Sequence, residues 1–97
     1  MFMRMEESKE EYTLNISPEF ERILDKVKKF DSELLARLEK QLVKILRNPN
    51  FGKPMRNVLR NYRRAHVDSH VLIYEVSGNQ VRLIDFDHHD RVYKKYS

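Results

Sequence analysis

Residues 62–87 read YRRAHVDSHVLIYEVSGNQVRLIDFD, and this stretch decides the fold. It contains three segments that favour β-strands: residues 62–67, a nearly continuous apolar run over residues 70–76, and residues 81–87. The sequence Ser77-Gly78-Asn79-Gln80, between the second and third segments, is typical of a hairpin turn. The stretch therefore predicts three consecutive antiparallel strands.

Two amphipathic helices are predicted upstream of these strands. Ser17-Pro18 supplies a side-chain cap and a first-turn proline, and Asp31-Ser32-Glu33 starts a second helix after a tight break. The second helical pattern stops at Asn48-Pro49. Apolar side chains follow three- and four-residue spacing in both segments: Phe20, Ile23, Leu24, Val27, Phe30, and then Leu34, Leu35, Leu38, Leu42, Ile45 and Leu46.

The remaining segments complete an α+β architecture. Tyr12, Leu14 and Ile16 alternate with polar residues, which predicts a short first strand beside one of the later three. We expect a loop over residues 50–54 and a short helix or tail over residues 88–96. The predicted order is β-α-α-β-β-β with a short C-terminal helix: a strand, a two-helix hairpin and a three-stranded antiparallel meander, with helices packed on one face of a small sheet.

The 97-residue length predicts one domain, which we place at residues 11–97, after a loose N-terminal extension over residues 1–10. The chain has no cysteine, which excludes disulfides and thiolate chemistry. No apolar run approaches the roughly 20 residues that span a bilayer, and residues 1–11 lack the apolar core of a signal peptide. A cytoplasmic protein without a membrane partner is expected.

The net charge of +4 lies entirely in the second half of the chain. Residues 1–50 hold ten basic and ten acidic side chains, whereas residues 51–97 hold nine basic and five acidic ones. Residues 53–67 contain no acid and five bases: Lys53, Arg56, Arg60, Arg63 and Arg64. A solvated basic face is one interpretation, but the clustering of three arginines favours RNA or DNA as a polyanionic partner.

Histidines supply the candidate proton-transfer groups, because imidazole is the side chain that ordinarily titrates nearest to neutral pH. His66 follows the basic stretch and His89 ends the last strand, so a meander can bring them together near the arginines. His88 has the opposite strand parity and is expected to point away from whatever His89 faces. Tyr93 lies one helical turn after His89 and is a candidate base-stacking residue or a packing residue.

A metal site is the alternative use of this segment. Strand alternation predicts Asp85, Asp87 and His89 on one face, where they could serve a metal-dependent nuclease. Known zinc spacings such as HExxH do not occur in the sequence. Cleavage of RNA through its own 2′-hydroxyl needs no metal, and we therefore expect neither a metal nor a small-molecule cofactor.

Three motifs together resemble the RelE/ParE toxin superfamily over residues 11–96. They are YRRAHVD at residues 62–68, VLIYEV at residues 71–76, and HDRVY at residues 89–93. The order of the predicted elements is the RelE order too. The stretch around Ala65-His66-Val67 is most similar to the YafQ branch, which matches His66 and His89 to catalytic histidines and Tyr93 to a closing aromatic residue.

The resemblance implies a toxin of a type II toxin–antitoxin system. Such a toxin is an endoribonuclease that cuts mRNA in the ribosomal A site, inhibits translation and is neutralised by a small cognate antitoxin. His66, His89, Tyr93 and Arg64 would form the catalytic set. The residues expected to contact RNA or the ribosome are Lys53, Arg56, Arg60, Arg63, His70, Lys94 and Lys95.

The sequence departs from the YafQ pattern after His66, where the family's Asp-Trp pair is replaced by Ser69-His70-Val71. His70 is a candidate for part of that role. Two rival functions share the predicted fold. ParE-type relatives poison DNA gyrase, and they generally lack the closing histidine and aromatic residue. A degenerate toxin would bind its antitoxin without catalysis.

Overall fold

The computed structural model describes residues 12–96, so the predicted extension over residues 1–10 lies outside the described residues. Short turns of 3₁₀ helix occur at Pro49–Phe51 and Asn57–Leu59. The other elements, in chain order, are β2 (Thr13–Ile16), α1 (Pro18–Phe30), α2 (Ser32–Arg47), β3 (Lys53–Pro54), β4 (Tyr62–Val67), β5 (His70–Ser77), β6 (Gln80–His88) and α3 (His89–Tyr96).

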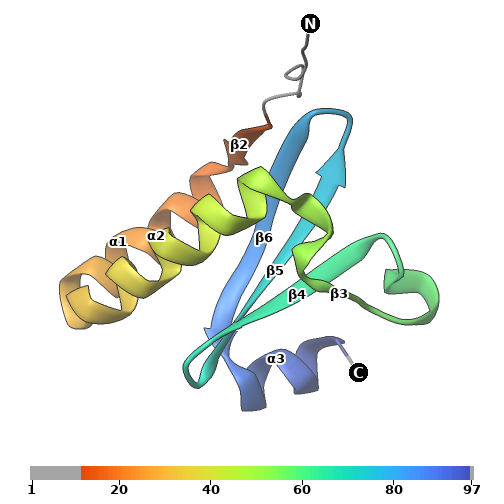
Figure 1. Ribbon diagram of the computed structural model, residues 1–97. Coiled ribbons are helices and arrows are strands. Elements are labelled where there is room, and N and C mark those ends of the chain that lie inside the picture. The colour runs from red at the N-terminus through yellow and green to blue at the C-terminus, as the bar shows by residue number, and fades with distance from the viewer. Residues whose placement is uncertain (1–11, 97) are drawn as a thin grey trace, which may run out of the picture.

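All strands belong to one sheet with the order β2-β6-β5-β4-β3 (Figure 1). Strands β4, β5 and β6 form the predicted antiparallel meander. The first strand, β2, pairs with β6 in parallel, with Leu14 opposite Val81. The predicted α+β architecture and element order are therefore confirmed.

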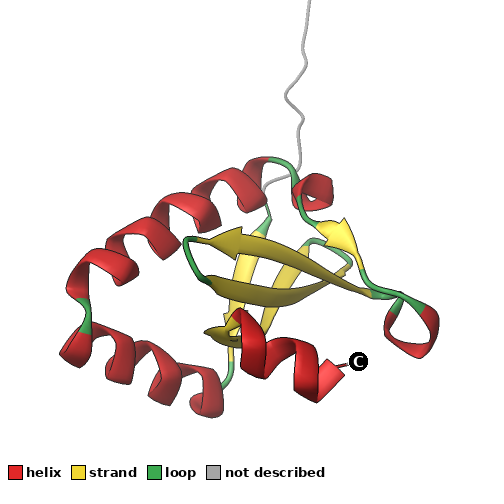
Figure 2. Cartoon of the chain, turned by 90° about the horizontal axis from the view of Figure 1, so that it is seen from below, coloured by secondary structure: helices red, strands yellow, loops and turns green. Residues whose placement is uncertain are grey.

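Helices α1 and α2 begin where their caps predicted. The Ser17 hydroxyl accepts a hydrogen bond from the backbone N–H of Phe20 at 3.1 Å, and the Asp31 carboxylate accepts one from Leu34 at 3.0 Å. Each cap satisfies a backbone donor that a helix start leaves without an intrahelical partner. The two helices form the hairpin that covers one face of the sheet (Figure 2).

The sheet is covered on both faces, which the sequence did not predict. Leu72 and Tyr74 of β5 belong to the main core with α1 and α2, whereas Val71 and Ile73 pack with Val92 of α3. Because successive strand residues point to opposite faces, α3 lies on the face away from the helical hairpin. Figure 2 shows α3 running beside the strands and separate from the α1–α2 pair. We call these the hairpin face and the α3 face.

A β-bulge in β6 changes which residues point to each face. Tyr74 pairs with Leu83, but the preceding residue Ile73 pairs with Asp85, which leaves Ile84 as the extra residue. Leu83 packs in the main core before the bulge, and simple alternation would place Asp85 there too. The bulge instead turns Asp85 towards the α3 face.

The predicted loop over residues 50–54 contains a short strand, so that prediction was wrong in part. Lys53 pairs with Arg64 and Pro54 pairs with Arg63 at the edge of the sheet. A proline is compatible with an edge strand, because its missing N–H can face away from the ladder. A two-residue strand has no periodicity, and this is why the sequence pattern did not reveal it.

The buried hydroxyl of Tyr74 binds the segment before β3 to the core through hydrogen bonds. That hydroxyl accepts a hydrogen bond from Gly52 N–H and donates one to the Pro49 carbonyl, both at 2.8 Å. A Cβ on Gly52 would lie 2.7 Å from both the Arg64 carbonyl oxygen and the Tyr74 hydroxyl, so the contact requires glycine. Burial raises the pKa of Tyr74.

Replacement of Tyr74 by phenylalanine should lower the free energy of unfolding by about 2–4 kcal/mol, because it leaves two buried backbone groups without partners. Urea denaturation measures this change. Tyr62→Phe is the matched control, because the Tyr62 hydroxyl makes no hydrogen bond within residues 12–96. Equal stabilities for the two variants would contradict the prediction.

Within residues 12–96, no helix combines the length and the apolar character that crossing a membrane requires.

Candidate nucleic-acid site

Strand β4 directs two predicted site residues to the α3 face. Ala65 and Val67 are buried in the main core, whereas Tyr62 packs with the cluster beneath α3. Arg64 and His66 have the same strand parity as Tyr62, so they face α3. His66 is exposed and Arg64 is half-buried.

Arg63 has the opposite parity and is not part of this group. Its guanidinium donates hydrogen bonds to the carbonyl oxygens of Gly52 at 2.6 Å and Asn50 at 3.4 Å. The side chain thus holds the segment that precedes β3. The sequence placed Arg63 with Arg64 and His66, but the structure does not bring them together.

Helix α3 brings Tyr93 against His66 and places His89 beside Tyr93. The Tyr93 hydroxyl lies 3.4 Å from the His66 Nε2 atom, and the ring centroids of His89 and Tyr93 are 6.1 Å apart. The three residues come from β4 and from the first and second turns of α3. The structure therefore groups the residues for which the sequence predicted chemistry, although their catalytic roles remain predictions.

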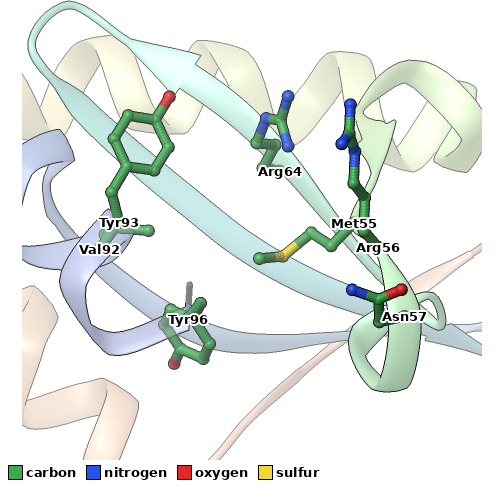
Figure 3. A pocket seen from close by; sticks show the side chains of 7 residues that line it. All are labelled: Met55, Arg56, Asn57, Arg64, Val92, Tyr93 and Tyr96. Carbon is green, nitrogen blue, oxygen red and sulfur yellow. The ribbon is translucent and has the colours of Figure 1, made fainter.

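A pocket of about 360 Å³ opens between β4, α3 and the turn that follows β3. Figure 3 shows Tyr93, Arg64 and Arg56 pointing the same way around it, with the thioether of Met55 between them. The pocket is lined by Met55, Arg56, Asn57, Arg64, Val92, Tyr93 and Tyr96.

The Arg64 Nε atom is a buried donor with no hydrogen-bond partner among the described residues. A buried donor without a partner costs free energy, more so when the group is charged. Arg56 adds a second positive charge to the lining, and the lining contains no carboxylate. An anion such as a phosphate group would satisfy Arg64 and meet both charges.

Lys53 lies in a second hollow on the edge of the sheet. This hollow measures about 310 Å³, and Lys53, Arg64 and His66 contribute to its lining. The hollow and the pocket share Arg64, and they add Lys53 and Arg56 respectively. Basic groups in two neighbouring hollows suit an extended polyanion.

The other predicted RNA contacts lie elsewhere. Arg60 is exposed and donates a 3.5 Å hydrogen bond to the Asn57 carbonyl, and Lys94 is exposed on α3. His70 lies on the hairpin face, where its ring stacks on Phe86 with centroids 5.2 Å apart. Burial, and then the neighbouring His88, lower the pKa of His70.

The prediction that His88 points away from whatever His89 faces was wrong. The two ring centroids are 4.4 Å apart, and the Nδ1 atoms of both rings lie within 4 Å of the Asp90 carboxylate. Strand parity does not apply to this pair, because β6 ends at His88 and α3 begins at His89. The His89 N–H donates a hydrogen bond to the Ser69 carbonyl at 2.9 Å, which fixes the start of the helix.

The predicted metal set of Asp85, Asp87 and His89 does not assemble. Lys95 occupies both carboxylates, at 2.6 Å from Asp85 and 3.5 Å from Asp87. Asp85 is 8% exposed and also accepts a 3.0 Å hydrogen bond from the Tyr96 hydroxyl. The two aspartates therefore anchor α3 to the sheet, and Lys95, predicted to contact RNA, serves this anchor.

The anchor between Asp85 and Tyr96 should be sensitive to alkaline pH. Burial and the negative charge of Asp85 raise the pKa of Tyr96 from 10.0 to about 12. Burial alone would lower the pKa of Lys95, but the hydrogen bond and charge of Asp85 more than offset this and raise it. Folding raises the pKa of both Tyr96 and Lys95. Their contribution to the free energy of unfolding is therefore complete below the pKa of the unfolded chain and is lost as pH rises through the pKa of the folded protein.

We expect the wild-type protein to be more stable than Tyr96→Phe at pH 8 by about 1 kcal/mol. This advantage should disappear between pH 10 and about 12, as the Tyr96 phenol ionises beside Asp85. Urea denaturation of both proteins across this range tests the effect. A difference that stays constant up to pH 12 would show that Tyr96 ionisation is not coupled to stability.

Sequence reasoning missed Met55, Asn57 and Tyr96 as lining residues of the pocket. Met55 and Asn57 come from a segment that the sequence did not assign to a strand or a loop, and Tyr96 comes from the last turn of α3. Asn57 has a positive φ of 59°, a conformation that asparagine tolerates better than most residues, and it starts the 3₁₀ turn at the rim. The asparagine within a basic segment was a signal for such a turn.

Comparisons with known proteins identify similar chains over nearly the whole length. The family described as "ParE toxin of type II toxin-antitoxin system, parDE" matches residues 14–93. A protein of Methanocaldococcus jannaschii named "Putative toxin RelE4" is 39% identical over 87 residues, which covers 87% of this chain and 93% of that protein.

Solved structures share the fold at low sequence identity. The YoeB/ParE toxin from Agrobacterium tumefaciens has a TM-score of 0.72 and 16% identity, and the match covers 79% of this chain and 98% of that one. A chain of the toxin–antitoxin complex RelBE2 from Mycobacterium tuberculosis has a TM-score of 0.69 and 24% identity, with 81% and 99% covered. These likenesses show the α+β fold.

Proposed function

Because the chain belongs to the ParE toxin family of type II toxin–antitoxin systems, we propose that it is a toxin that inhibits translation as a ribosome-dependent mRNA endoribonuclease. The observation that carries this proposal is the contact of His66 with Tyr93, next to His89 and the Arg64 pocket. Two imidazoles beside an unsatisfied guanidinium are the groups that metal-independent cleavage of RNA requires.

The proposed reaction is an in-line displacement at one phosphate of the message. One of His66 and His89 removes the proton from the 2′-hydroxyl, whose oxygen then attacks phosphorus. The bond from phosphorus to the 5′-oxygen breaks, and the other histidine donates a proton to that leaving oxygen. The products are a 2′,3′-cyclic phosphate and a 5′-hydroxyl end.

Arg64 stabilises the negative charge that develops on the phosphoryl oxygens, because its side chain lines the pocket together with Tyr93 and lines the neighbouring hollow together with His66. Tyr93 is 47% exposed and offers its ring for stacking on an unpaired base. Lys53 and Arg56 bind phosphates on either side of the scissile bond. Stacking and phosphate binding together orient the 2′-oxygen for attack.

Two partners follow from this proposal. The ribosome presents the A-site message, and the basic surface around Lys53 and Arg56 is the region suited to ribosomal and messenger RNA. The second partner is a small antitoxin protein that neutralises the toxin. The support for it is the family and the solved RelBE2 chain, which is part of a toxin–antitoxin complex.

The test combines the purified protein with ribosomes that are translating a defined message. We expect cleavage within the A-site codon, and no cleavage of the same RNA without ribosomes. Primer extension locates the cut. An intact message under these conditions would refute the proposed activity, and growth arrest without cleavage would point to another target.

Inhibition of DNA gyrase is the second candidate, because the matching family is described as the ParE toxin. A supercoiling assay separates the two activities: a ribonuclease leaves gyrase unaffected, whereas a gyrase poison stops supercoiling and leaves the message intact. A protein that only binds an antitoxin would do neither and would not arrest growth when expressed alone.

A further inference from the structure

A cluster of ligand atoms lies at the junction of β6 and α3, outside the pocket described above. The side chains of His88, His89 and Asp90 place one potential metal-ligating atom each within 4.8 Å of one another. His88 is the last residue of β6, and His89 and Asp90 are the first two residues of α3. The proposed cleavage uses His89 but gives no role to the other two.

The spacing of these atoms suits a small tetrahedral cation. His89 Nδ1 lies 3.0 Å from one Asp90 carboxylate oxygen, and His88 Nδ1 lies 3.8 Å from the other. Zinc binds imidazole nitrogen at about 2.0–2.1 Å and carboxylate oxygen at about 2.0–2.2 Å, so tetrahedral ligands lie roughly 3.3–3.5 Å apart. The two distances fall on either side of this range, and small side-chain rotations would meet it.

The hydrogen bonds around the cluster present acceptor atoms to its centre. His88 Nδ1 accepts a 3.2 Å hydrogen bond from the Asp90 backbone N–H, so in the neutral ring its proton is on Nε2. The lone pair of Nδ1 is directed at the Asp90 N–H, and the Asp90 carboxylate oxygen, also an acceptor, lies 3.8 Å from the same nitrogen. A cation bound to both His88 Nδ1 and the Asp90 carboxylate would stabilise these two acceptors, and it would replace the 3.2 Å hydrogen bond from the Asp90 N–H.

The backbone of the cluster is held in place before any ligand binds. The His88 N–H donates to the Asp87 carboxylate at 2.8 Å, and the His89 N–H donates to the Ser69 carbonyl at 2.9 Å. Fixed backbone positions reduce the entropy that ordering a site would cost. The side chains of His88 and His89 are 34% and 41% exposed, so a metal ion can reach them from solvent.

We propose that His88, His89 and Asp90 bind one Zn²⁺ ion and that the bound ion inhibits the toxin. The inhibitory part rests on the proposed function, because Zn²⁺ would occupy the imidazole of His89 and remove it from proton transfer. The positive end of α3 opposes a cation, and the Asp90 carboxylate offsets this. Two imidazoles and one carboxylate favour zinc over Mg²⁺, which prefers oxygen ligands in octahedral geometry.

Isothermal titration of the full chain with ZnCl₂ tests binding without reference to activity. We expect one equivalent to bind the wild-type protein, and an affinity at least about tenfold lower for His88→Gln and for Asp90→Asn, since even residues that only support a ligand are worth that much. His66→Gln is the matched control, a histidine outside the cluster that should leave the affinity unchanged. No binding by wild type, or equal binding by all four proteins, would overturn the site.

Cleavage assays then test inhibition. Zn²⁺ should inhibit the wild-type protein, and Mg²⁺ at the same concentration should not. The His88→Gln variant should cleave the message at the wild-type rate and lose most of its sensitivity to Zn²⁺, with Asp90→Asn as the second variant. Equal inhibition of wild type and both variants would refute inhibition through this cluster. Zinc binding by a protein that never cleaves RNA would instead leave the site standing and refute the proposed function.

Discussion

Replacement of both His66 and His89 by alanine is expected to reduce ribosome-dependent cleavage by at least about 10³-fold. Each proton-transfer group contributes roughly 10²–10⁴-fold, and the two contributions do not simply multiply when the groups act as a unit. Either single variant should therefore lose nearly as much as the double variant. The rate is measured by single-turnover cleavage of a message on programmed ribosomes.

His88→Ala is the matched control for this experiment. His88 is a histidine of similar exposure next to His89, but it does not contact Tyr93, so its loss should leave the rate within about twofold of wild type. Full activity in the double variant would mean that other groups transfer the protons. A large loss in His88→Ala would show that the assignment within the histidine pair is wrong.

Removal of the Asp85 carboxylate should release α3 from the sheet. Asp85→Ala leaves the Tyr96 hydroxyl without its partner and removes the nearer of the two carboxylates that Lys95 contacts, and Asp85 is buried. Hydrogen bonds to a charged group are worth about 1.5–3 kcal/mol, and Lys95 can recover part of that in water because it is 46% exposed. We expect a loss of about 2–3 kcal/mol in the free energy of unfolding.

Catalysis should fall further than this stability change explains, because α3 carries both His89 and Tyr93. Under conditions where the variant remains folded, kcat should fall more than KM rises, since binding groups such as Arg64 and Lys53 stay on the sheet. Glu75→Gln breaks the exposed 3.1 Å pair with Arg82 and is the control, with an effect below about 1 kcal/mol. Equal effects of Asp85→Ala and Glu75→Gln would contradict the anchor.

The sequence predicted the meander and the helical hairpin because their signals are local. The strand predicted over residues 62–67, the apolar run that follows, and the caps at Ser17 and Asp31 all agree with the structure. Local patterns did not reveal β3, since two residues have no period. They also did not place α3, because nothing in its spacing says which face of a sheet a short helix covers.

In the candidate site, too, local sequence patterns predicted some features and missed others. Strand parity on β4 distinguishes Arg64, which faces the site, from Arg63, which faces the hairpin, and the sequence already contains that distinction in the buried Ala65 and Val67. Parity failed at His88 and His89, where a strand becomes a helix. The anchoring role of Asp85 was beyond prediction, because it depends on a bulge that no composition signal marks.

The extra residue Ile84 shifts by one residue the alternation that decides which side chains of β6 face the core. Before it, the residues that build the core have odd numbers; after it, they have even numbers, so Phe86 continues the layer that Leu83 began. One strand can therefore supply hydrophobic packing to one side and carboxylates to the other, with only the extra residue left out of its pairing. Deletion of Ile84 would therefore remove the bulge and leave regular pairing, in which Asp85 still lies opposite Ile73 on the α3 face and Phe86 still lies opposite Leu72 on the hairpin face.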